Sequence, residues 1–202
     1  MTLRLNGSTS GYVEIDAPAT AGSNTLVLPT GNGTSGQVLS TNGSGALSWV
    51  QGGRILQVVN SVKTDTFSTA STTFVDVSGV SASITPASTS NKILVTVSFA
   101  ADHDSSSYPM FRILRDSTSV LLGDSAGTRI QVTFGTSAAS GNRPQAASYT
   151  LLDSPNATSA TTYKVQMRVA SGTGYVNRSA LDTDTTGYFR SAATITLMEV
   201  VA

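Results

Sequence analysis

The chain has one histidine, His103, and its neighbours are the first residues whose types could do chemistry. It lies in the sequence Asp102-His103-Asp104, and a histidine between two carboxylates could bind a metal ion or form a catalytic His–Asp pair. Neighbouring side chains of a strand point to opposite faces, so these three converge only in a tight turn. Because three serines follow directly, we interpret the segment as a solvated loop and assign it no metal-binding or catalytic role.

A second candidate is the sequence Asp182-Thr183-Asp184-Thr185-Thr186-Gly187, which places oxygen ligands at alternate positions before a glycine, as a calcium loop does. Such loops end in a bidentate glutamate near position 12, and this chain has Ser191-Ala192-Ala193 there. We therefore favour a loop that connects two strands. If three copies of the chain met at an axis, these aspartates could still share an ion.

Enzyme motifs are otherwise missing from the sequence. The nearest approach to a serine-hydrolase elbow is Gly7-Ser8-Thr9-Ser10-Gly11, which has threonine at its centre and no helix after it. The only glutamates, Glu14 and Glu199, lie near opposite ends of the chain and make a poor glycosidase pair, although aspartate pairs stay open. With no cysteine there is no disulfide framework and no thiolate metal site. We expect a non-enzymatic protein with no cofactor.

Binding chemistry is more plausible than catalysis. Tyr108, Tyr175 and Tyr188 fall in or beside expected loops, near hydroxyl, amide and carboxylate groups, where an aromatic face could hold a sugar ring or a peptide. The alternative is that these rings fill the ends of the fold or an interface between subunits, because aromatic residues dominate cores and interfaces alike. The three tyrosines are our candidate receptor-binding residues.

Several arginines and aspartates could likewise form ion pairs between subunits, or belong to solvated faces. They are Arg112, Arg115, Arg129 and Arg190, with Asp116, Asp124 and Asp182.

The segments that must position these residues have the pattern of strands. In 92–99, Ile93, Val95 and Val97 share one face with Phe99, and in 163–169 Tyr163 and every second residue after it do the same. One buried face and one polar face per strand is typical of two packed antiparallel sheets. Between residues 54 and 202 the sequence predicts a β-sandwich, jelly-roll-like, with strands at 54–63, 73–77, 91–100, 109–115, 118–122, 128–134, 146–152, 161–169, 174–178 and 192–201.

Residues 1–53 differ from the rest of the chain. Short β-prone runs alternate with glycine and asparagine turn signals such as Gly31-Asn32-Gly33 and Asn42-Gly43-Ser44-Gly45. The expected strands are Leu3–Leu5, Tyr12–Ile15, Thr25–Leu28, Gln37–Ser40 and Leu47–Val50. Such strands bury too little surface to fold alone, so we expect an arm that packs on copies of itself or on a platform. Gln51-Gly52-Gly53 is the expected hinge between this arm and the head, residues 54–202.

Composition limits the partners. The formal net charge is +0 and 12% of the residues are charged, about half of the usual ~25%, so the chain offers no long-range attraction for nucleic acid or an anionic membrane. No apolar run approaches the ~18 residues that span a bilayer, and the first residues lack the apolar core of a signal peptide. We expect neither nucleic-acid binding nor membrane insertion.

Ordered motifs of the arm resemble a segment found in fibre proteins of marine tailed phages, cyanobacterial phages among them. They are Leu5-Asn6-Gly7-Ser8-Thr9-Ser10-Gly11-Tyr12-Val13-Glu14, Ala17-Pro18-Ala19-Thr20-Ala21-Gly22-Ser23-Asn24-Thr25-Leu26, Leu28-Pro29, Gly36-Gln37-Val38-Leu39, Thr41-Asn42-Gly43 and Leu47-Ser48-Trp49. The head is similar to the C-terminal heads of such proteins in Lys63-Thr64-Asp65-Thr66-Phe67-Ser68, Ile84-Thr85-Pro86, Asn91-Lys92-Ile93-Leu94-Val95, Leu152-Asp153-Ser154-Pro155 and Ala193-Thr194-Ile195-Thr196-Leu197-Met198-Glu199.

The resemblance implies a parallel homotrimer in the virion, made in the host cytoplasm, with an N-terminal attachment arm and a jelly-roll head that binds host-surface glycan. Long shafts and a large tail-docking domain, which tail fibres carry, are missing, and this favours a compact knob or short fibre. One alternative is a capsid decoration or cement protein without a receptor. Another is an extracellular sugar-binding module similar to tumour-necrosis-factor-like trimers, against which the missing signal peptide argues.

Overall fold

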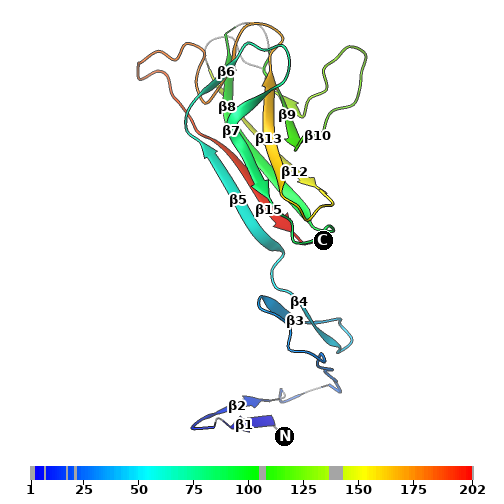
Figure 1. Cartoon of the computed structure of the whole chain (residues 1–202). Coiled ribbons are helices and arrows are strands. Elements are labelled where there is room, and N and C mark those ends of the chain that lie inside the picture. Colours follow the sequence, from blue (N-terminus) through cyan, green and yellow to red (C-terminus); the bar gives the residue numbers. More distant parts are fainter. Residues whose placement is uncertain are drawn as a thin grey trace. The chain divides into compact units, whose positions relative to one another are not determined.

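A computed structural model describes residues 3–6, 8–16, 18–20, 22–104, 108–136 and 143–201. Within these ranges the chain forms antiparallel strands and turns and no helix, so the predicted all-β class is confirmed. Contacts divide the chain into two compact units, Met1–Gly53 and Arg54–Ala202. We call them the arm and the head, and describe each by itself (Figure 1).

The described residues of the arm form two short hairpins. One pairs β1 (Leu3–Asn6) with β2 (Tyr12–Ile15), and the other pairs β3 (Gln37–Thr41) with β4 (Leu47–Gln51). The strand expected at Thr25–Leu28 is reduced to a single bridge between Val27 and Ala46. All arm residues whose exposure is described are exposed or half-buried.

The described residues of the head form eleven strands in two sheets. They are β5 (Ile55–Lys63), β6 (Phe67–Thr69), β7 (Val75–Ile84), β8 (Lys92–His103), β9 (Met110–Arg115), β10 (Thr118–Val120), β11 (Phe134–Gly135), β12 (Gln145–Asp153), β13 (Thr161–Arg168), β14 (Gly174–Val176) and β15 (Ala193–Val200). Most of them match an expected strand. The exceptions are β6, which the pattern missed, β7, which is longer than 73–77, and the strand expected at 128–134, where only β11 forms.

Strand order identifies the topology. In the first sheet β15 and β12 pair with the same residues of β8 and must lie on its two sides, which gives the order β5-β15-β8-β12. The short strand β14 pairs with the last residues of β8, and β6 pairs with β14. In the second sheet the order is β7-β13-β9-β10. Taken along the chain, the eight strands of these two orders cross from one sheet to the other at every step except from β9 to β10, which are neighbours in the second sheet. This connectivity is that of a jelly roll, the architecture that the sequence predicted.

One apolar core lies between the two sheets. The inward faces predicted from the alternating pattern are confirmed, since Ile93, Val95 and Val97 are fully buried, as are Val165 and Met167. Phe99, Phe111 and Phe134 pack together in this core with ring centroids 4.8–5.7 Å apart, Phe111 stacked on Phe134 and Phe99 tilted against both.

Candidate binding site

All long connections of the head lie at one end of the sandwich, which we call the loop end. The chain leaves β5, β8, β10 and β13 there and returns in β7, β9, β12 and β15, whereas Arg54 and the C-terminal end of β15 lie at the opposite end (Figure 1). Tyr108, Tyr175 and Tyr188 all fall in loop-end segments. The topology therefore gathers residues that lie up to about eighty positions apart in the sequence.

An ion pair organises the last of these connections, between β14 and β15. Arg190 donates from Nε to Asp182 Oδ1 at 3.0 Å and from Nη2 to Asp182 Oδ2 at 2.6 Å. Arg178 Nη1 lies 3.6 Å from the same carboxylate. Asp182 has a positive φ of 45°, a conformation that aspartate tolerates better than most residues. The Arg190 guanidinium holds the pKa of Asp182 below its ordinary value.

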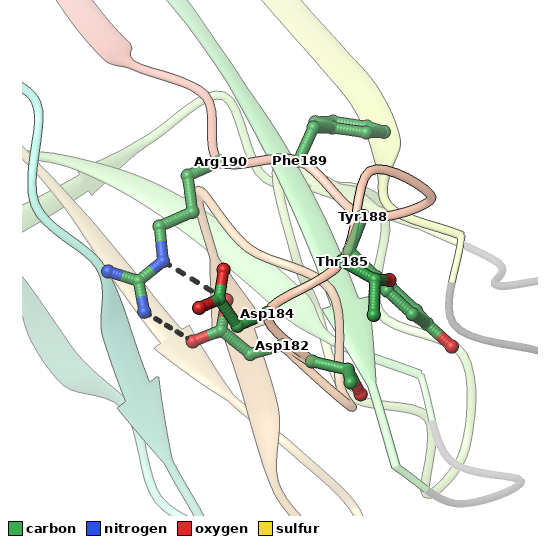
Figure 2. Close-up of a pocket in the computed structure, with 7 residues that line it drawn as sticks. Asp182, Asp184, Thr185, Tyr188, Phe189 and Arg190 are labelled. Carbon is green, nitrogen blue, oxygen red and sulfur yellow. Dashed lines mark hydrogen bonds and ion pairs between the residues drawn. The ribbon is translucent and has the colours of Figure 1, made fainter.

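The loop surrounds a hollow of about 430 Å³, which lies beside this ion pair. Its lining residues are Asp182, Thr183, Asp184, Thr185, Tyr188, Phe189 and Arg190. Figure 2 shows Asp184 next to the Asp182–Arg190 pair, and the rings of Tyr188 and Phe189 directed away from it. Phe189 is 56% exposed although it is large and apolar. The hollow thus combines carboxylates, hydroxyls, a guanidinium and two aromatic rings, the mixture that fixes a polar ligand with apolar faces.

Tyr175 links two loops rather than lining this hollow. Its hydroxyl donates to Asp104 Oδ2 at 3.3 Å, and the Arg178 guanidinium lies over its ring, 4.4 Å from the centroid. Asp104 also accepts a hydrogen bond from the Thr173 amide at 2.7 Å, and this bond lowers the pKa of Asp104. Tyr175 therefore positions Arg178, which in turn lies near Asp182.

Tyr108 and His103 form a separate contact at the same end. Tyr108 is 55% exposed, and its ring meets His103 edge-on with the centroids 6.4 Å apart. His103 is buried, and neither ring nitrogen has a hydrogen-bond partner among the described residues. The interpretation of this segment as a solvated loop is wrong for Asp102 and His103, because both are buried residues of β8. Ser105–Ser107, on which that interpretation rested, lie outside the described residues.

Asp102 and Asp182, two of the aspartates singled out as possible metal ligands in the sequence, are bonded to groups of the chain itself. Asp102 is buried, and its carboxylate accepts the amides of His103 at 2.8 Å and Ala180 at 2.9 Å. The Asp182 carboxylate is held by arginine. Throughout the described ranges, no group of three or more His, Cys, Asp or Glu side chains is placed to hold a metal ion.

Two of the arginines considered for contacts between subunits form ion pairs within the chain. Arg190 pairs with Asp182, and Arg115 Nη1 donates to Asp153 at 2.7 and 2.9 Å. Sequence reasoning overlooked Arg178. Its spacing of four residues from Asp182 was the available signal, but only the loop conformation makes that spacing a contact.

Comparisons with known proteins give the following result. No protein-family model matches the chain, and no curated protein matches it either. Among solved structures it is similar to "Structure of infectious bursal disease virus Gx strain", with 15% identity over 99% of this chain and 46% of that chain, at a TM-score of 0.37. It is also similar to the corresponding Gt strain structure, with 14% identity over 98% of this chain and 46% of that chain, at a TM-score of 0.36. The chain thus spans less than half the length of these viral chains.

None of the residues that the structure describes belongs to a helix of the length and apolar character needed to cross a membrane.

Proposed function

We propose that the chain is a structural protein of a virion surface, a homotrimeric knob or short fibre that acts by binding and not by catalysis. Its arm fixes it to other virion proteins, in the capsid or the tail, and its loop end binds a host-surface glycan. The sequence resemblance to marine phage fibres supports the virion role. The jelly roll supports the arrangement, because the loop end lies at the opposite end of the head from Arg54, where the arm joins.

The observation that carries the glycan proposal is the hollow at residues 182–190. The rings of Tyr188 and Phe189 offer apolar faces to the C–H face of a sugar, and the nearby carboxylates and hydroxyls can accept its hydroxyl protons. Arg190 and Asp182 hold each other in a bidentate geometry, which fixes the backbone of the loop before a ligand arrives.

The test of glycan binding uses the purified full-length chain and an array of bacterial surface polysaccharides. We expect the Tyr188→Ala change to weaken binding about tenfold or more, as loss of an aromatic anchor does. Tyr12→Ala is the matched control, since Tyr12 is 54% exposed and lies in the arm. If the unchanged chain binds none of the polysaccharides, the glycan role is wrong and the decoration alternative is favoured.

The virion role is tested by cryo-electron microscopy of purified particles. We expect knobs of three chains at the particle surface, and we expect a chain lacking residues 1–53 to fold but stay absent from particles. Density on the capsid, together with particles that adsorb normally without the protein yet lose heat resistance, would favour the decoration alternative. Recovery of the truncated chain on particles would show that the arm is not the attachment segment.

A further inference from the structure

The two outer faces of the sandwich differ in chemistry. On the outer face of the second sheet, charged groups are paired with each other: Lys164 Nζ donates to Asp76 Oδ2 at 2.8 Å, and Gln166 Nε2 donates to Asp76 Oδ1 at 2.6 Å. Arg112 Nε donates to Gln166 Oε1 at 2.8 Å and lies over the Phe74 ring. Such a network is typical of a face that stays in water.

The outer face of the first sheet has almost no charge. Met198 of β15 is in register with Val58 of β5 and with Leu94 of β8, and Leu94 is in register with Leu152 of β12. These four residues form a row across the strands β5, β15, β8 and β12, which we call the apolar row. Val58 is 56% exposed and Leu152 is 53% exposed, so the row is open at both ends.

The next row of this face is polar, and several of its groups bond with each other. Thr196 Oγ1 donates to Asn60 Oδ1 at 3.0 Å, and the hydroxyls of Thr96 and Thr150 lie 3.1 Å apart. A partner that covers the face therefore leaves few of these polar groups without a hydrogen bond, which lowers the cost of removing them from water.

We infer that the outer face of the sheet β5-β15-β8-β12 binds a second copy of this chain. This inference depends on the proposed function in one respect, the expectation that three copies assemble. Charge favours a copy as the occupant. On the outward positions of the four strands the charged residues are Lys92 and Asp102, and Asp102 is buried with its carboxylate bonded to two backbone amides. A face with so little exposed charge does not repel its own kind. A contiguous exposed apolar row on a sheet face is typical of a protein interface.

The experiment measures the mass of the full-length chain by analytical ultracentrifugation over a range of concentrations. We expect oligomers for the unchanged chain, and a dissociation constant raised about a hundredfold by Leu152→Lys, because the change buries an unpaired charge in the interface. Leu181→Lys is the matched control, with a leucine 58% exposed in the loop end. Circular dichroism of each variant confirms that the head is folded.

A second measurement avoids the charge. The chain contains no cysteine, so Leu152→Cys and Leu181→Cys each supply a single thiol whose labelling rate reports its accessibility. We expect the thiol at position 152 to be protected as concentration rises, and the thiol at 181 to stay reactive.

The outcomes separate the two proposals. A chain that is monomeric at all concentrations, or an oligomer that neither Leu152→Lys nor the labelling affects, overturns the inferred surface. Protection at position 152 that does not depend on concentration assigns the face to the chain's own arm and also overturns it. A dimer that Leu152→Lys dissociates supports the surface while contradicting the proposed trimer.

Discussion

At the scale of single residues, the buried carboxylate of Glu199 is the most demanding feature of the head. It is fully buried on β15 and accepts hydrogen bonds from Asn91 Nδ2 at 2.6 Å, Gln57 Nε2 at 2.6 Å and the Ala87 amide at 2.7 Å. Burial acts to raise the pKa of Glu199, but these hydrogen bonds outweigh it and hold the pKa below its ordinary value of 4.5. Glu199 therefore joins the strand to the connection between β7 and β8 as a charged group.

The first prediction is that Glu199→Gln lowers the free energy of unfolding of the head by about 2 kcal/mol at neutral pH. The side-chain NH2 of glutamine would face Asn91, Gln57 and the Ala87 amide, which all donate to the carboxylate, and one of these donors would lose its acceptor. The pH dependence follows from the lowered pKa of Glu199. The carboxylate's contribution is fully present above the unfolded-state pKa and is lost as pH falls through the folded-state pKa. Urea unfolding followed by circular dichroism from neutral pH to below pH 4 measures both effects.

Glu14→Gln is the matched control for this change. It removes the same charge from an exposed position of the arm and should leave the unfolding of the head unaltered. Equal effects of the two substitutions, or a Glu199→Gln variant whose loss of stability persists unchanged at low pH, would contradict the role given to Glu199.

At the scale of elements, β7 shows how the sheets are joined at their edges. Its register with β13 shifts between the pairs Lys164–Ser81 and Gln166–Asp76, which leaves additional residues of β7 in a bulge. Gly79 lies in this bulge with φ +82°, and Ser61 Oγ of the edge strand β5 lies 3.5 Å from its carbonyl oxygen. The bulge thus brings the edge strands of the two sheets together.

The second prediction is that Gly79→Ala destabilises the head by about 1–2 kcal/mol, the cost of a left-handed conformation for a residue with a Cβ. Crowding does not contribute, since an added Cβ would lie 3.5 Å from the Lys63 side chain, which is ordinary contact. Gly135→Ala is the control, because its φ is not positive and an added Cβ would lie 3.6 Å from the nearest atom. The difference between the two variants in urea midpoint checks the backbone explanation, and equal midpoints would refute it.

At the scale of the whole molecule, the arm and the head differ in what holds them together. The buried cluster of the head runs from Val77 to Leu197. In the arm, by contrast, Trp49 is a half-buried residue whose Nε1 donates to the Gly31 carbonyl at 2.7 Å, and its ring lies against Gly33. We expect the arm to be the less stable of the two.

The third prediction uses the fact that Trp49 is the single tryptophan. Its fluorescence reports on the arm, whereas circular dichroism is dominated by the strands of the head. We expect the fluorescence transition at a lower urea concentration than the circular dichroism transition. A chain of residues 54–202 should retain the circular dichroism transition of the full chain, and a single coincident transition would mean that the arm and head unfold together.

The sequence by itself determined the fold class and the buried faces, because alternation with a period of two is a local property of a strand. The inward sets beginning at Ile93 and Tyr163 were predictable for this reason, and they are confirmed. Element boundaries were less predictable. The strand β7 exceeds its expected range because its bulge at Gly79 interrupts the alternation. The strand expected at 128–134 is nearly absent because, within that range, only Phe134 pairs with β9.

Tertiary structure alone decided which strands pair. That pairing in turn decided which residues lie together in the candidate binding site and in the apolar row. Hydrogen bonds between strands join residues distant in sequence and leave no mark in the local pattern. The row from Val58 to Leu152 exists because β5, β15, β8 and β12 are neighbours. The sequence could nominate Tyr188 and Asp182 as separate residues, and only the folded loop placed both around one hollow, with Arg190 holding the carboxylate.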